Sequence, residues 1–171
     1  QKLKDSIKEF ETQDKKESKK RLFVYSFNLT DIKTRMYLCY GMSFKSEKEA
    51  FLSAVEMLKE INIKINSLRL DRYYQQFYVE LLEKELGITK FYIIPKKNAT
   101  IKGSWEWKRM LHDFVNNTTE YLEEYFQRNQ SESGFSEDKK RTGWKLGQKR
   151  EDRLETANIC TSLWHNLYWL G

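Results

Sequence analysis

Apolar positions along the chain change their period from two residues to three or four, and this change predicts the order of strands and helices. Residues 22–29 and 36–44 are rich in β-branched and aromatic side chains, and a polar turn separates them, so they predict an antiparallel hairpin. Ser46 and Glu49 form a capping-box signature before an apolar helical period, which predicts a helix over residues 47–61. Residues 63–70 and 90–94 predict two more strands, and the helix between them ends at Gly87.

The pattern after Pro95 is helical. Apolar residues keep one helical period from Trp107 to near Gln130, and a last helix is predicted over Leu154–Leu170. The order of elements predicts an α/β fold class with an antiparallel hairpin in front. Residues 1–20 are mostly charged or polar and predict a flexible lead-in, followed by one folded domain over residues 21–171.

Composition supports a folded core. Aromatic residues make up 15% of the chain and hydrophobic residues 39%, against 33% charged residues. No apolar run approaches the roughly 18 residues of a membrane span. Cys39 and Cys160 lack the spacing of a disulfide framework or metal site, which fits a reducing cytoplasm. The chain begins with Gln, and nothing before Arg21 resembles a core element, so we expect a longer reading frame.

The net charge of +6 is concentrated late in the chain, where seven basic residues face two acidic ones between Lys139 and Arg153. This cluster favours a polyanionic partner such as DNA. A solvated helix face fits the same composition equally well.

Two groups of residues carry candidate chemistry. Asp71 directly follows the apolar strand, and functional side chains gather at the C-terminal ends of strands in α/β sheets, although Asp is also a common turn residue. Tyr125, Arg128, Glu132 and Lys139 would fall within a stripe about 60° wide on a helix. Gly134 weakens the prediction of an unbroken helix, and a charged helix face can produce such a stripe by chance.

The spacing Tyr-x2-Arg-x3-Glu-x6-Lys from Tyr125 to Lys139 resembles the YREK signature of bacterial and archaeal insertion-sequence transposases of the DDE type. Residues 70–74, Leu-Asp-Arg-Tyr-Tyr, look like the strand that carries the second aspartate of that family. The strand 91–94 with Pro-Lys-Lys-Asn after it looks like the next one. The resemblance extends from about residue 21 to the end of the chain.

The resemblance implies a ribonuclease H-like mixed sheet flanked by helices, from which the first strand and its Asp are missing. Asp71 and Glu132 would then be catalytic residues that hold two Mg²⁺ ions, or Mn²⁺. Tyr125, Arg128 and Lys139 would contact DNA phosphates, and the basic cluster with Lys149 and Arg150 would extend that contact. The alternative third ligands, Asp5, Asp14 and Asp31, lie outside apolar strands, so we expect this fragment alone to be inactive.

The implied function is DNA transposition by metal-dependent phosphodiester cleavage and strand transfer at insertion-sequence ends. Its partners would be double-stranded transposon ends, target DNA and a second copy of the chain in a homodimer, in the prokaryotic cytoplasm at the nucleoid. Two alternatives stay open, a catalytically inactive DNA-binding remnant and a ribonuclease H-like nuclease or resolvase. We expect surface or capping roles for His112 and His165. Most tryptophans are expected in the core rather than stacked on a base; they are Trp105, Trp107, Trp144, Trp164 and Trp169.

Overall fold

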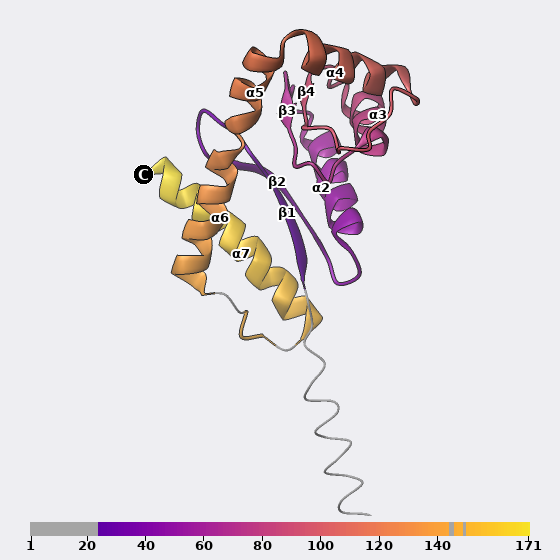
Figure 1. The fold of residues 1–171 in the computed structure, drawn as a ribbon. Helices are drawn as coiled ribbons and strands as arrows, with labels where there is room; N and C mark the ends of the chain where they lie inside the picture. The colour runs from indigo at the N-terminus through magenta and orange to yellow at the C-terminus, as the bar shows by residue number, and fades with distance from the viewer. Residues whose placement is uncertain (1–23, 144–145, 149) are drawn as a thin grey trace, which may run out of the picture.

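The computed structural model describes residues 24–143, 146–148 and 150–171 (Figure 1). The predicted hairpin is confirmed: β1 (Tyr25–Thr30) and β2 (Tyr37–Ser43) pair antiparallel, with Phe27 opposite Gly41. The turn between them is held by Asp31, whose carboxylate accepts hydrogen bonds from the Thr34 backbone N–H at 2.9 Å and hydroxyl at 2.7 Å. Asp31 therefore has the role of a turn residue.

Helix α2 (Glu47–Ile61) packs on this hairpin and has the predicted bounds. Its N-cap is Ser46, whose hydroxyl accepts from the Glu49 N–H at 3.2 Å, and its apolar face includes Phe51. The approach of α2 to β2 is very close. A Cβ added at Gly41 would lie 1.9 Å from the Ala50 carbonyl oxygen, so only glycine fits this position.

The second pair of strands is parallel and shorter than predicted. β3 (Leu68–Arg69) pairs with β4 (Phe91–Tyr92), and α3 (Gln76–Leu86) connects them and ends at Gly87, whose φ is 66°. The strand predicted over 63–70 is wrong for residues 63–67, which form no strand. β4 stops after Tyr92 because the Tyr121 hydroxyl takes up both the N–H and the C=O of Ile93, at 2.7 and 3.1 Å.

The single helical segment predicted to end near Gln130 is wrong. Three helices occupy this part of the chain, namely α4 (Trp105–Asn116), α5 (Thr118–Phe126) and α6 (Asn129–Thr142). The first break lies at Asn117, whose φ of −126° and ψ of 44° leave the helical region. The last helix, α7 (Glu151–Leu170), confirms the predicted C-terminal helix.

A buried polar network anchors α6 and α7 to the hairpin. Tyr37 donates from its hydroxyl to Asp138 Oδ2 at 2.6 Å, and His165 Nδ1 lies 2.9 Å from Asp138 Oδ1. The Tyr37 and His165 rings stack at 3.8 Å, and the Asn166 side chain bonds both backbone groups of Tyr37. The surface or capping role expected for His165 is wrong, since this side chain is only 1% exposed.

The fold is a mixed α/β structure, as predicted, but the strands of the described residues form two separate two-stranded sheets. Figure 1 shows α6 and α7 on one side of the hairpin and α2 and α3 on the other. Trp107 is buried as expected, whereas Trp105 and Trp164 are 72% and 59% exposed, and Trp144 lies outside the described residues. Within the described residues, no helix is long and apolar enough to cross a membrane.

Candidate functional site

Asp71 is presented at the C-terminal end of β3. Leu68 and Leu70 are buried and fix the strand, since their N–H groups donate to the Lys90 and Tyr92 carbonyls at 3.0 and 3.1 Å. The next residue, Asp71, leaves the core with its side chain 58% exposed. Its backbone carbonyl accepts from the Tyr74 N–H at 2.9 Å, which closes a turn and holds the carboxylate at the strand end.

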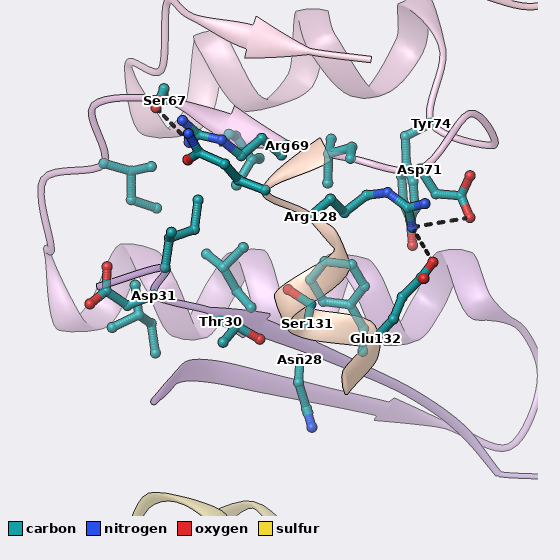
Figure 2. A pocket seen from close by; sticks show the side chains of 18 of the residues that line it. Asn28, Thr30, Asp31, Ser67, Arg69, Asp71, Tyr74, Arg128, Ser131 and Glu132 are labelled. Atoms are coloured by element: carbon teal, nitrogen blue, oxygen red, sulfur yellow. Dashed lines mark hydrogen bonds and ion pairs between the residues drawn. The ribbon is translucent and has the colours of Figure 1, made fainter. Parts of the chain in front are cut away.

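Glu132 reaches the same place from the first turn of α6, with its side chain 61% exposed. Arg128, which immediately precedes α6, lies between the two carboxylates (Figure 2). Its Nη1 is 2.8 Å from Glu132 Oε1 and 3.9 Å from Asp71 Oδ2. Two oxygens that contact one nitrogen are at most about 7 Å apart, a spacing that a pair of metal ions could bridge. The structure therefore brings the carboxylates of Asp71 and Glu132 together around the Arg128 guanidinium.

The Arg128 guanidinium is held by its surroundings. Its Cζ lies 5.4 Å from the centre of the Tyr125 ring, and its backbone N–H donates to the Tyr125 carbonyl at 3.1 Å. Burial opposes the charge of Arg128, but the electrostatic influence of Tyr125, Glu132 and Asp71 outweighs burial and raises the pKa of the guanidinium. Arg128 is thus a permanent positive charge at the site. Its Nε is buried without a hydrogen-bond partner among the described residues.

A pocket of about 610 Å³ opens beside this cluster, and Asp71, Arg128 and Glu132 are among the residues that line it. Its walls are β1, residues 63–71 and the start of α6. Figure 2 shows Asp71 and Glu132 at one end of it and Arg69 with Ser67 toward the other. The pocket therefore lies between the two sheets, with the paired carboxylates at its edge.

The pocket also contains residues that the sequence did not single out. Arg69 donates from Nη1 to the Ser67 hydroxyl at 2.8 Å and from Nε to the Glu124 carbonyl at 3.0 Å, and it forms an ion pair with the Glu124 carboxylate. This ties β3 to α5. Tyr74 donates to Glu47 Oε1 at 3.3 Å, and burial first, then Glu47, raises the pKa of Tyr74. The sequence had included Tyr74 only as the last residue of the stretch 70–74 that resembles the second-aspartate strand.

Among the described residues, the other predicted phosphate contacts do not line the pocket. Tyr125 is 5% exposed, on α5 rather than on the helix of Glu132, so its ring supports Arg128 from behind. Lys139 is exposed on α6, about two turns after Glu132, and does not line the pocket. Arg150 is paired with Asp152 at 2.7 Å at the start of α7, and Lys149 lies outside the described residues. Their contacts with phosphates stay predictions.

The donor set can be compared with what a metal ion needs. Carboxylate oxygens are the ligands that Mg²⁺ prefers in proteins, and both Asp71 and Glu132 are exposed enough to bind one. Their contact with one guanidinium nitrogen fits a shared cation position. Within residues 24–143, 146–148 and 150–171, however, no group of three or more His, Cys, Asp or Glu side chains is arranged to hold a metal ion. Among the described residues, Asp71 and Glu132 therefore fit as two of the ligands that a metal site would need.

Comparison with known proteins shows a similarity to a transposase. The chain is 43% identical over 147 residues to the probable transposase for insertion sequence element ISA1214 of Archaeoglobus fulgidus. The match covers 85% of this chain and 44% of the relative, so the chain spans less than half the length of the protein that it matches. No protein-family model matches the chain, and no solved structure matches it. The chain is therefore a homologue of part of a probable insertion-sequence transposase.

Proposed function

We propose that this chain is part of the catalytic domain of a DDE-type insertion-sequence transposase and that Asp71 and Glu132 are two of its metal-binding carboxylates. The observation that carries this proposal is the convergence of Asp71, from the end of β3, and Glu132, from α6, on one nitrogen of Arg128. The similarity to a probable transposase supports the same reaction class. DNA ends and target DNA would be its substrates, and a second copy of the chain its partner.

Each residue of the cluster has a distinct task in this reaction. Asp71 and Glu132 would hold Mg²⁺ or Mn²⁺, which when bound would activate water or a DNA 3′-hydroxyl and stabilise the leaving oxygen. Once the carboxylates have another cation, the Arg128 guanidinium is available to bind a phosphate beside the scissile bond. Tyr125 keeps the guanidinium at the site through its ring. Lys139 and the basic segment around Arg150 would bind phosphates farther along the duplex.

The unpaired edges of β1 and β3 support the finer proposal of a ribonuclease H-like sheet. In the described residues β1 pairs only with β2, and β3 only with β4, so each sheet has an edge strand on the wall of the same pocket. The outer edges of β1 and β3 therefore have backbone N–H and C=O groups without a strand partner among the described residues. We infer that a further strand pairs with β1 and β3 and brings a third carboxylate toward Asp71.

A longer chain tests this inference. The match covers 44% of the relative, so a longer protein is the place to look for such a strand. We expect the 171-residue chain to show no DNA cleavage in Mg²⁺ or Mn²⁺, because two carboxylates offset only half the charge of two divalent ions. Cleavage should appear when an upstream strand that ends in Asp is added. Robust cleavage by the short chain would contradict this proposal.

The catalytic proposal itself is tested by strand transfer with paired DNA ends in the longer protein. Asp71→Asn and Glu132→Gln should each abolish metal-dependent cleavage and joining. Glu123→Gln, which changes an exposed carboxylate of α5 away from the pocket, is the matched control and should retain both reactions. Activity that survives Asp71→Asn would refute the assignment. Cleavage without joining would point to the nuclease or resolvase alternative.

A second candidate function is DNA binding without cleavage. It is favoured by the finding that the described residues supply two, rather than three, candidate ligands. Under this reading the longer protein would bind DNA through the basic residues and remain inactive in every divalent ion. Metal-dependent cleavage that is lost in Asp71→Asn would exclude it.

A further inference from the structure

Two half-exposed aromatic rings lie just after Asp71. Tyr73 is 50% exposed, in the turn that follows β3, and Phe77 is 49% exposed, in the first turn of α3. Single exposed aromatic residues are common on protein surfaces and need no explanation. Tyr73 and Phe77 differ from such residues in three ways. Both rings contact the buried Tyr78, a lysine ammonium lies over each ring, and both residues closely follow Asp71 in the sequence.

Buried tyrosines hold both rings in place. The Tyr73 ring centre is 5.5 Å from that of Tyr74 and 6.1 Å from that of Tyr78, and the Phe77 ring is 5.2 Å from Tyr78. The Tyr73–Tyr74 and Phe77–Tyr78 pairs are nearly perpendicular, at 89° and 82°, which is a favourable edge-on arrangement. Burial first, and then the Tyr73 hydroxyl, raise the pKa of Tyr78 to about 12. Each exposed ring therefore packs against at least one buried tyrosine.

A lysine lies over each ring. Lys96 Nζ, from the segment after β4, is 5.7 Å from the Tyr73 ring centre, and Lys48 Nζ, from the first turn of α2, is 4.4 Å from that of Phe77. Residues from three separate parts of the chain thus place two aromatic rings, each with a lysine ammonium over it, in contact with Tyr78. Lysine stems are long and flexible, so each ammonium can leave its ring for a phosphate nearby.

These residues border the pocket through Tyr74. Tyr74, which touches Tyr73, lines the pocket together with Asp71, and Figure 2 shows these two side chains beside Arg128. Glu47 also lies there, bonded to the Tyr74 hydroxyl, so the surface is not uniformly positive. A ligand that suits it therefore needs a flat face for the rings and an anionic group for the lysines. An unpaired nucleotide has both.

We propose that Tyr73 and Phe77 form a stacking surface for an unpaired base of the DNA strand at the Asp71–Glu132 site, with Lys96 and Lys48 binding its flanking phosphates. The proposal rests on the proposed function, which places the scissile phosphate at Asp71. On binding, the base replaces the lysine ammonium over the aromatic ring, and the displaced ammonium binds the flanking phosphate. No covalent bond changes, and because every base has a flat face, little sequence preference is expected.

The test uses a short DNA duplex with an unpaired extension that carries a fluorescent adenine analogue, whose emission falls when it stacks. The full chain should bind this probe and quench it. Tyr73→Ala should weaken binding by about 5- to 100-fold, the usual loss for one base–aromatic stack, and should restore the emission. Tyr73→Phe keeps the ring and should bind normally. Trp164→Ala, which removes an exposed ring of α7, is the control and should also bind normally.

Each result is decisive when thermal unfolding shows that the variants are folded. Unchanged affinity and quenching in Tyr73→Ala would overturn the proposal, as would equal losses in Tyr73→Ala and Trp164→Ala. Loss of binding in Tyr73→Phe as well would assign the effect to the hydroxyl and would also overturn it. The proposed function has a separate readout, the metal-dependent cleavage by the longer protein, which Asp71→Asn abolishes. Failure of stacking with cleavage intact, or of cleavage with stacking intact, therefore identifies which proposal is wrong.

Discussion

Arg128 occupies a position between the two candidate metal ligands, and we predict that it competes with divalent cations for them. The perturbation is Arg128→Gln, which removes the charge and keeps a polar side chain. In the structure one guanidinium nitrogen lies 2.8 Å from Glu132 and 3.9 Å from Asp71. A metal ion that binds both carboxylates must replace these contacts.

The size of the effect follows from exposure. Two unit charges 4 Å apart would interact by about 4 kcal/mol at an effective dielectric constant of about 20. Asp71 and Glu132 are 58% and 61% exposed, so solvent screens most of this energy. Exposed ion pairs contribute about 0.2–1 kcal/mol each, and two such pairs give about 0.4–2 kcal/mol. Removing them should therefore tighten cation binding by about 2- to 30-fold.

Binding of Mn²⁺, followed by electron paramagnetic resonance at low ionic strength, measures this directly. Arg128→Gln should bind Mn²⁺ more tightly than the unaltered chain, and adding Glu132→Gln to that variant should reverse the gain. Lys59→Gln is the matched control, because it removes a surface charge of α2 that pairs with Glu56 and Glu85. Equal or weaker Mn²⁺ binding by Arg128→Gln would refute the reasoning.

Three further predictions concern packing, the buried network and DNA. Gly41→Ala should destabilise the chain by about 3 kcal/mol or more in urea unfolding, because its Cβ would collide with the α2 backbone, whereas Gly147→Ala has open space and should be neutral. Asp138→Asn should cost about 3 kcal/mol in the same assay, since it disrupts a buried charged partner of Tyr37 and His165, and a loss below about 1 kcal/mol would contradict this. Lys149→Ala with Arg150→Ala should flatten the slope of log affinity for duplex DNA against log salt by up to about two. An unchanged slope would show that Lys149 and Arg150 are solvated surface charges that do not contact the DNA backbone.

Local signals predicted the local elements well. The Ser46 cap and the apolar period that follows it fixed both ends of α2, and Gly87 marked the end of α3. The hairpin was equally clear, because its turn is closed by contacts within a few residues of Asp31. Such features depend on neighbours in sequence, so the sequence contains the information that determines them.

Features that depend on distant partners could not be predicted in the same way. The apolar period runs unchanged across Asn117 and Gln127, where the helices break. Gly134, which argued against a continuous helix, instead lies inside α6, where a Cβ would come within 3.2 Å of the His165 ring. The bond between Tyr37 and Asp138 joins residues 101 positions apart and has no local signature. Tertiary packing determines these features.

The same distinction explains what the sequence could say about the site. The YREK-like spacing singled out Arg128 and Glu132 on one expected continuous helix. In the structure Arg128 lies in the turn between α5, which carries Tyr125, and α6, which carries Glu132. Tyr125 packs against the guanidinium, whereas Glu132, like Asp71 after β3, lines the pocket. The motif therefore contains residues in two different environments. Tyr125 is a buried ring that positions the Arg128 guanidinium, and Glu132 is an exposed carboxylate that the guanidinium contacts. A spacing rule alone cannot separate them, whereas Tyr125→Phe and Tyr125→Ala can, because only loss of the ring should displace Arg128.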